Sequence, residues 1–470
     1  MLLDPVAELL CLIQADPDRV IAGVDKDVFV ARAPGRLDVM GGIADYMGSL
    51  VCEMPLAVAS AVAVQRRDDR QLRISTYNAA AAHGRHNVEL SLDDFYGSAS
   101  LLPFAEIARL FTGDRHWAAY VAGAYVVLSK HRKLTRRATG ANIACYSNVP
   151  LGGGVSSSAA LEVAALSALT AAYHLILEPM EIAVMAQKVE QLIVRTPVGV
   201  MDQATSTLGE KGKLLLVNCQ PHSVEGLIDL PKGVEIVGIV SNVKHKTYEE
   251  DYRDTRVAAF MAQAMIAKAY RDFGAKTDPT RGYLANVKPE MYLRYFRRML
   301  PRVMSGKFFT DHYGKTIDWV TTVEEQKQYK VRLAADYHVL ECARVRKFVE
   351  ALGQGDEESL QRAGRLMVSN HASYSRRLKL GSPQADLLVR LVMREGVRNG
   401  FYGAKITGGA SGGTVAVMCR GTDDVRERLG RICAEYKNQT GLEAGLLVGS
   451  SDGAAKTGAQ RMSAAKVVGG

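Results

Sequence analysis

The chain has 470 residues, 47% of them hydrophobic and 23% charged, and these values indicate a globular protein with two large lobes. Its net charge of +9 does not by itself indicate nucleic-acid binding, because the densest basic run, at 130–137 (KHRKLTRR), has no interleaved aromatic residue that could stack on bases. Seven scattered cysteines without a CxxC pair, and no apolar run near the roughly 20 residues that span a bilayer, lead us to expect a cytoplasmic protein that binds no membrane.

Apolar strand-like runs alternate with helical stretches along the whole chain, which favours an α/β or α+β architecture. The first clear element is a strand at 27–31 (DVFVA). Pro34 and Gly35 then predict a turn, which would place Arg36 at the end of the strand. The following loop, 40–49 (MGGIADYMGS), carries an acidic and an aromatic residue among small and apolar groups.

A second informative region combines a helix around 121–128, a strand at 141–147 (ANIACYS) and a helix at 162–175. Between the strand and the second helix lies VPLGGGVSSSAALE, 149–162. Its three glycines allow a ligand to approach the backbone, and its three serines supply hydroxyls at the positive end of a helix. This pattern predicts an anion site, in particular for phosphate, although a tight turn into a helix is the alternative. The Walker pattern GxxxxGK[ST] is absent.

Later segments add further candidates. Glu190 lies in a helical stretch, and Asp202 precedes another at 204–209, where each would be ordinary if read alone. A second glycine cluster, 404–418 (AKITGGASGGTVAVM), runs into a strand. It is consistent with a simple hairpin, or with a backbone that passes closely over a nucleotide or over the first glycine loop.

Three segments in this order, APGRLDVMGGIADYMGS, VPLGGGVSSSAALE and ITGGASGGTVAV, resemble the three motifs of the superfamily of galactokinase, homoserine kinase, mevalonate kinase and phosphomevalonate kinase. The resemblance to the galactokinase branch extends over nearly the whole chain, through WAAYVAG, QKVEQ…VGVMDQ, SNVKH and DYRDTR. It implies an α+β fold with a lobe like ribosomal protein S5 domain 2 at 1–215, and a ferredoxin-like lobe at 216–470 with an insertion at about 276–330. ATP and a sugar would meet between the lobes.

The resemblance also implies roles for individual residues. Asp202 matches the catalytic aspartate that accepts or orients the proton of the sugar's C1 hydroxyl, and Arg36 matches the arginine beside it. Ser158 and Glu190 match the ligands of Mg²⁺. The residues expected to bind ATP are Gly152, Gly153, Gly154, Ser156, Ser157, Ser158, Trp117, Ser147, Gly408 and Gly409. The adenine is expected near Trp117, Tyr120 and the strand end at Ser147 and Asn148.

One departure from the galactokinase pattern bears on the sugar. Galactokinases carry Glu-His-Thr-Asp-Tyr where this chain has Gly42-Ile43-Ala44-Asp45-Tyr46. In that family the Glu and His hold the C6 hydroxymethyl group and the Asp holds ring hydroxyls. Burying a hydroxymethyl group without partners costs about 1–3 kcal/mol per lost hydrogen bond, so Gly42 and Ile43 disfavour galactose.

L-Arabinopyranose has the ring hydroxyls of galactose and lacks C6, so it fits the altered loop. The stretches at 282–301, 321–345 and 448–458 resemble the kinase portion of L-arabinokinases, which supports the same sugar. Tyr252, Gly199 and, with less support, His245 are further candidate sugar contacts. Restoring Gly42→Glu with Ile43→His should therefore move the preference toward galactose.

Three alternatives stay open at this point: a galactokinase, a kinase for another galactose-like sugar such as fucose, and a catalytically silent regulator that binds sugar and ATP. Ser156 to Ser158 together with Asp202 argue for catalysis. The oligomeric state, monomer or weak dimer, is not fixed by the sequence. The segment at 276–330 is interpreted as an insertion that covers hydrophobic surface.

Overall fold

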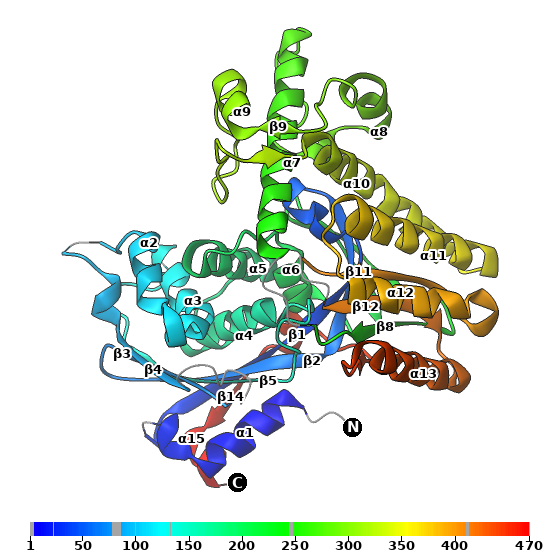
Figure 1. Ribbon diagram of the computed structural model, residues 1–470. Helices are drawn as coiled ribbons and strands as arrows, with labels where there is room; N and C mark the ends of the chain where they lie inside the picture. Colours follow the sequence, from blue (N-terminus) through cyan, green and yellow to red (C-terminus); the bar gives the residue numbers. More distant parts are fainter. Residues whose placement is uncertain are drawn as a thin grey trace.

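The computed structural model describes residues 4–21, 23–77, 86–98, 100–131, 133–243, 248–409 and 413–469. Two sheets, each with helices packed against it, form the body of the molecule, and a largely helical segment projects beyond them (Figure 1). The α+β fold class is confirmed. None of the described helices is both long enough and apolar enough to cross a bilayer.

The larger sheet has the order β14-β1-β2-β5-β3-β4, and β6 pairs with the first residues of β2 and with β7. Only β3 and β5 are parallel neighbours. The strands are β1 (Asp27–Met40), β2 (Leu50–Arg66), β3 (Gln71–Thr76), β4 (Asn87–Ser91), β5 (Ala141–Ser147), β6 (Lys213–Asn218), β7 (Ser223–Asp229) and β14 (Ala459–Ser463).

The predicted turn at Pro34 and Gly35 is wrong, because β1 continues through both residues. Its pairing with β2 shifts register between Pro34 and Arg36, which is a bulge. A bulge tolerates a proline, which lacks the N–H that a regular ladder needs, and it redirects the next side chain. Arg36 therefore lies inside the strand and is buried, with its backbone N–H donated to the carbonyl of Val155 at 3.1 Å.

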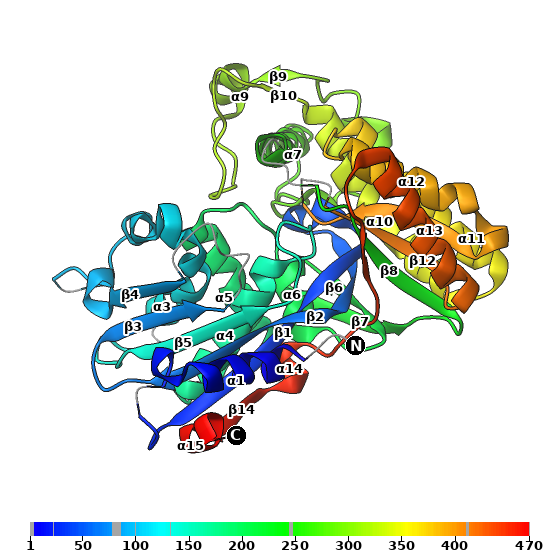
Figure 2. The ribbon, with the colours of Figure 1, turned by 60° about the horizontal axis from the view of Figure 1, so that its bottom comes forward.

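Helices cover both faces of this sheet (Figures 1 and 2). The central helix, α4, is apolar on all sides, as expected for a helix buried between a sheet and other helices. It packs against β1 and β2. The helices of its layer are α3 (Ala119–Lys130), α4 (Ser157–Ala172), α5 (Pro179–Lys188) and α6 (Met201–Leu208), and those of the opposite face are α1 (Pro5–Ala15) and α15 (Ala464–Gly469).

The smaller sheet is antiparallel with the order β11-β12-β8-β13. Alternate residues of β8 enter different apolar clusters, as the two-residue period of a strand requires. The strands are β8 (Val234–Val240), β11 (Phe401–Thr407), β12 (Thr414–Arg420) and β13 (Gly445–Leu447), and the nearby helices are α10 (Val331–Gln354), α11 (Glu357–His371), α12 (Pro383–Glu395) and α13 (Asp423–Thr440).

The segment at 276–330 lies between the long helix α7 (Tyr248–Asp272) and α10. Its side chains Leu284, Tyr292, Phe296 and Phe309 are buried in one cluster with residues of both helices. The segment therefore covers apolar surface of α7 and α10. The helices and strands of this segment are α8 (Pro289–Met291), β9 (Met304–Ser305), α9 (Gly306–Tyr313) and β10 (Gln328–Tyr329). Two short helices lie elsewhere in the chain, α2 (Phe104–Ile107) and α14 (Ala454–Thr457).

The predicted lobe boundary at residues 215 and 216 does not coincide with a boundary between the sheets. Strand β6 spans that point, and β7 and β14, which follow it in the sequence, also belong to the larger sheet. The division into residues 1–215 and 216–470 stays a prediction about lobes.

Candidate functional site

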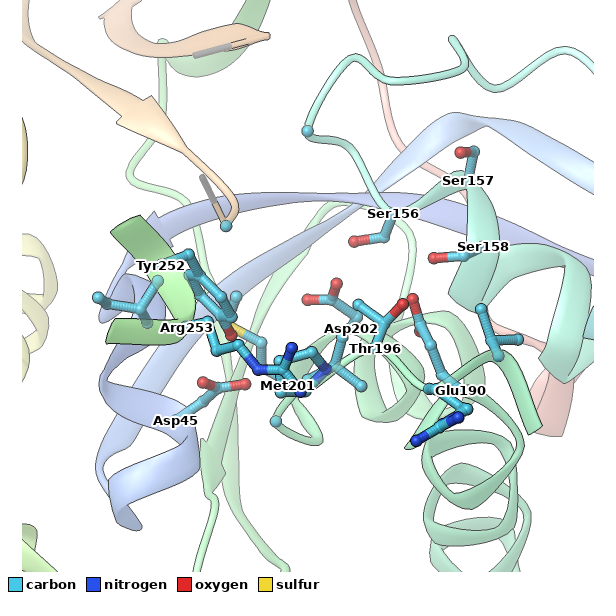
Figure 3. Close-up of a pocket in the computed structure, with 18 of the residues that line it drawn as sticks. Asp45, Ser156, Ser157, Ser158, Glu190, Thr196, Met201, Asp202, Tyr252 and Arg253 are labelled. Atoms are coloured by element: carbon cyan, nitrogen blue, oxygen red, sulfur yellow. The ribbon is translucent and has the colours of Figure 1, made fainter. Parts of the chain in front are cut away.

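A cavity of about 1010 Å³ lies where the N-terminal ends of α4, α6 and α7 meet the short helix η2 (Gly42–Met47) (Figure 3). It brings together most of the residues predicted from sequence. Those that line it are Arg36, Ile43, Asp45, Gly152, Gly154, Ser156, Ser157, Ser158, Glu190, Gly199, Asp202, Tyr252 and Gly409.

The glycine and serine loop before α4 has the geometry of an anion site. Ser156, immediately before the helix, has left-handed backbone angles (φ 61°, ψ 46°), which are unusual for a residue other than glycine. Its hydroxyl is buried and has no hydrogen-bond partner among the described residues. Because the first turn of α4 also has free N–H groups and the positive end of the helix dipole, this corner of the cavity can bind phosphate.

The second glycine cluster lies directly against this loop. The hydroxyl of Thr414 donates to the carbonyl of Gly153 at 2.5 Å. A Cβ at Gly408 would lie 2.4 Å from the carbonyl oxygen of Gly154, so no larger residue fits there without movement. Both interpretations left open by the sequence hold: the cluster joins the antiparallel strands β11 and β12 as a hairpin does, and it passes closely over the first glycine loop. Gly409 lines the cavity, whereas Gly153 and Gly408 lie behind the residues that line it.

Arg36, which is buried, and Asp202, whose side chain is 20% exposed, form an ion pair in the cavity lining. The Nε and Nη2 groups of Arg36 donate to Oδ1 of Asp202 at 2.8 and 2.6 Å, and Nη1 donates to the carbonyl of Gly154 at 3.0 Å. Burial by itself lowers the pKa of Arg36, but the neighbouring carboxylate of Asp202 outweighs that effect, and the pKa of Arg36 is raised. The guanidinium is therefore permanently charged, and it fixes the position of Asp202.

Glu53 is a buried neighbour that the sequence did not single out. Its Oε2 lies 3.4 Å from Nε of Arg36, on a fully buried side chain. Burial, and the nearby carboxylate of Asp38, hold the pKa of Glu53 well above its usual value. The protonated form of Glu53 is thus favoured, which leaves Asp202 as the main counter-charge of Arg36.

Ser158 and Glu190 lie together on the side of the cavity next to α4, where Ser158 is hydrogen-bonded to the Glu190 carboxylate. Nε2 of Gln203 donates to Glu190 at 2.9 Å and to the buried Glu162 at 3.2 Å. Burial and the charge of Asp202 raise the pKa of Glu190 to about 8. Glu162 was missed from sequence, although a glutamate in an otherwise apolar helix was a signal that could have found it.

The donor set around Glu190 fits magnesium. The ion prefers a few hard oxygen ligands from the protein and completes its shell with phosphate and water, and a hydroxyl beside a carboxylate supplies such ligands. Within the described ranges, no group of three or more His, Cys, Asp or Glu side chains is arranged to hold a metal ion.

Asp45 lies on the opposite side of the cavity with Ile43 and Tyr252. It is 5% exposed, and its Oδ1 accepts the N–H of Tyr46 at 2.6 Å. Burial, reinforced by the charge of Asp202, raises its pKa to about 7. Gly199 packs so closely that an added Cβ would lie 1.8 Å from Oδ2 of Asp45, which explains the need for glycine at that position.

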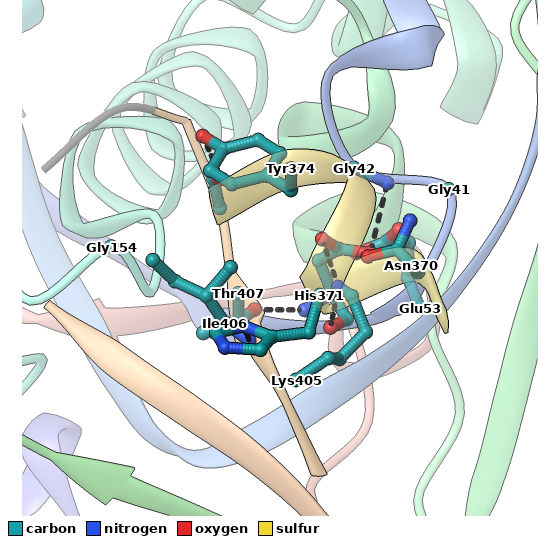
Figure 4. A network of polar contacts seen from close by, with 12 residues as sticks. Gly41, Gly42, Glu53, Gly154, Asn370, His371, Tyr374, Lys405, Ile406 and Thr407 are labelled. Carbon is teal, nitrogen blue, oxygen red and sulfur yellow. Dashed lines mark hydrogen bonds and ion pairs between the residues drawn. The ribbon is translucent and has the colours of Figure 1, made fainter. Parts of the chain in front are cut away.

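Gly42 does not line the cavity. Its backbone is left-handed (φ +55°), and an added Cβ would lie 2.7 Å from the hydroxyl of Tyr337. Its N–H donates to Oδ1 of Asp38 at 3.1 Å, and Oδ2 of Asp38 accepts from Nζ of Lys405 at 2.6 Å (Figure 4). The sequence argument treated Gly42 and Ile43 as a pair, but their surroundings differ. Gly42 lies in a buried polar network, whereas Ile43 lines the cavity.

The residues proposed for the adenine side are only partly placed in the cavity. Trp117 packs against the apolar cluster of the larger sheet, and Oγ of Ser147 is hydrogen-bonded to Ser60 and to the backbone of Val149. Neither lines the cavity, whereas His116 and Tyr120 do. His245 lies outside the described residues.

Comparison with known protein families finds three matches. Residues 119–210 match the GHMP kinases N terminal domain, residues 348–438 match the GHMP kinases C terminal model, and residues 21–66 match the galactokinase galactose-binding signature. The chain therefore carries both GHMP kinase domains and a galactokinase signature.

The chain is 37% identical, over 93% of its length, to the L-arabinokinase of Arabidopsis thaliana, and it spans 47% of that relative. It is 29% identical to a galactokinase of Actinobacillus pleuropneumoniae serotype 5b, with 87% of this chain and 90% of the relative covered. The structure of Lactococcus lactis galactokinase complexed with galactose superposes with a TM-score of 0.72 at 20% identity, covering 97% of this chain and all of that one. The last likeness confirms the fold.

Proposed function

We propose that this GHMP kinase transfers the γ-phosphoryl group of ATP to the anomeric hydroxyl of L-arabinose, giving β-L-arabinose 1-phosphate. The observation that carries the proposal is that one cavity holds both an anion site at the start of α4 and the pair Asp45 and Ile43. The likeness to an L-arabinokinase supports the choice of sugar.

The nucleotide binds with its phosphates against the first turn of α4, where Ser156 offers an unpartnered hydroxyl. Ser158 and Glu190 would hold Mg²⁺, which neutralises phosphate charge when it is bound. His116 and Tyr120 are the described residues of the cavity best suited to contact the base. His116 lies in the short helix η6 (Gly113–Ala118) and Tyr120 in α3, both beside Glu190.

Asp202 orients the C1 hydroxyl of the sugar and accepts its proton. Arg36 holds the carboxylate of Asp202 in place through two hydrogen bonds, so the carboxylate is positioned when sugar and nucleotide meet. Phosphoryl transfer needs positioning and charge neutralisation more than covalent participation, and a cavity with an anion site beside a fixed carboxylate supplies both.

The sugar lies between Asp202 and Asp45, and Asp45 binds ring hydroxyls. Ile43 presents an apolar surface where galactose would carry its C6 hydroxymethyl group, so a sugar without C6 avoids leaving that group unpaired. Because a galactokinase is among the relatives, galactose is the alternative substrate, and fucose-type sugars are a further alternative. A non-catalytic regulator is disfavoured, because Ser156 to Ser158 and Asp202 face one cavity.

The test is a coupled assay with ATP and Mg²⁺ on L-arabinose, D-galactose, L-fucose and D-fucose. We expect kcat/KM to be highest for L-arabinose, with the phosphate on C1 by NMR. Turnover of galactose without turnover of arabinose would refute the choice of sugar, and the absence of any turnover with retained binding of sugar and ATP would favour the regulator.

A further inference from the structure

Arg253 is an exposed arginine on α7 that lines the cavity beside Tyr252. In Figure 3 its side chain extends from α7 into the space between Asp45 and Asp202. Within the described ranges its guanidinium forms no hydrogen bond or ion pair. It was not among the residues singled out from the sequence, because an arginine on a helix that also carries Glu249, Glu250, Asp251 and Asp254 reads as a solvated charge.

Two other cations of the cavity are already neutralised. Arg36 is held by Asp202 and by the carbonyl of Gly154, and its side chain is 1% exposed. Nζ of Lys327 lies 2.8 Å from Glu250, 3.1 Å from Asp254 and 3.3 Å from Glu324. Neither cation has its charge free for a ligand that enters the cavity.

Acidic side chains surround the reacting atoms. Asp45, Glu190 and Asp202 all face the cavity, and the transferring phosphoryl group spreads negative charge over three oxygens. A cation that neutralises this charge must be free of protein partners and must reach the vicinity of Asp202. Arg195, the other exposed arginine of the lining, follows η7 (Val189–Val194), the helix of Glu190, whereas Arg253 extends toward Asp202 from the opposite side.

We propose that Arg253 is a catalytic residue that donates hydrogen bonds to the phosphoryl oxygens during transfer. In this step the C1 oxygen of the sugar forms a bond to the γ-phosphorus, and the bond from that phosphorus to the oxygen bridging it to the β-phosphate breaks. The hydroxyl proton passes to Asp202, and ADP leaves with the bridging oxygen. Arg253 exchanges no proton and contributes a planar group with a permanent positive charge.

The test compares Arg253→Ala and Arg253→Lys with Arg271→Ala, which removes the same charge from the exposed last turn of the same helix. Because the inference rests on the proposed transfer but not on the identity of the sugar, each variant is assayed with the sugar that the unmodified enzyme phosphorylates fastest. We expect Arg253→Ala to lower kcat by about 10²- to 10³-fold, with each KM within about threefold. Arg253→Lys should retain part of the rate, and Arg271→Ala all of it.

Two further measurements separate catalysis from structure. Millimolar guanidinium chloride should restore part of the rate of Arg253→Ala and should not accelerate the unmodified enzyme. Calorimetry with Mg²⁺, ADP and aluminium fluoride, a planar mimic of the transferring group, should show weaker binding to Arg253→Ala than to Arg271→Ala, and this readout needs no turnover. Equal rates and equal affinities in these two variants would overturn the proposal, as would a raised KM for the sugar with unchanged kcat.

Discussion

Replacing Ile43 tests the argument about the sugar most directly, because Ile43 lines the cavity beside Asp45 and Gly42 does not. In Ile43→His, the imidazole would offer a hydrogen-bonding partner where galactose carries its C6 hydroxyl. Ile43→Leu keeps an apolar side chain of similar volume and is the matched control. Adding Gly42→Glu tests whether the neighbouring position contributes as well.

The expected magnitude follows from one hydrogen bond to a buried hydroxyl. An unpaired buried polar group costs about 1–3 kcal/mol, which corresponds to about 5- to 150-fold in a ratio of kcat/KM values. The Gly42→Glu change should lower stability, because left-handed backbone costs a non-glycine residue about 1–2 kcal/mol and the new Cβ would lie 2.7 Å from the Tyr337 hydroxyl. Tyr337→Phe removes that contacting oxygen and should recover part of the loss.

The assay is the ratio of kcat/KM for D-galactose to that for L-arabinose, with thermal unfolding followed in parallel. Ile43→His should raise the ratio within the range above, and Ile43→Leu should leave it unchanged. The double variant should unfold at a lower temperature than Ile43→His. A folded Ile43→His protein whose ratio equals that of the unmodified enzyme would refute the claim that position 43 faces C5 of the sugar.

Three other residues give simpler tests. Asp202→Asn should lower kcat by about 10²- to 10⁴-fold while ATP still binds in calorimetry, and an unchanged kcat would remove Asp202 from the role of base. Ser156→Ala should weaken ATP binding by about 2- to 10-fold without changing unfolding in the absence of nucleotide, because the hydroxyl has no described partner; equal ATP affinity would argue against a phosphate contact. Because the folded pKa of Asp45 is raised to about 7, its contribution to stability is present below pH 4 and is lost as the pH rises to 7. Asp45→Asn should therefore gain unfolding temperature relative to the unmodified protein over that range, and parallel pH curves would contradict the shift.

The motifs that could be predicted from the sequence are those whose chemistry is local. Three glycines and three serines between a strand and a helix predict an anion site from local chemistry, and in the structure Ser156 to Ser158 line the cavity. Asp202 and Arg36, 166 residues apart, came from the family pattern, since neither has a distinctive local context.

The features that could not be predicted depend on contacts between distant segments. At the bulge near Pro34, β1 pairs with β2 and the N–H of Arg36 donates to the carbonyl of Val155, in the loop before α4. The contact of Glu53 with Arg36 requires the pairing of β1 with β2, and the pair of Asp38 and Lys405 forms only when the two sheets come together. Of the residues expected near the adenine, Tyr120 lines the cavity and Trp117 does not, whereas His116, which was not predicted, does. This difference reflects side-chain direction in a short 3₁₀ helix leading into α3, which spacing alone does not resolve.

The contact between the two glycine turns also has a consequence for tolerance to mutation. Thr414 and Gly153 are hydrogen-bonded although they are 261 positions apart, and around them the two turns meet as bare backbone. A methyl group added at Gly408 or at Gly413 would press on the same layer of the first loop. In a saturation library the two turns should therefore behave as one unit. A substitution in either turn needs the same space between the two turns. A second substitution, in the opposite turn, should therefore lower the stability by less than the first.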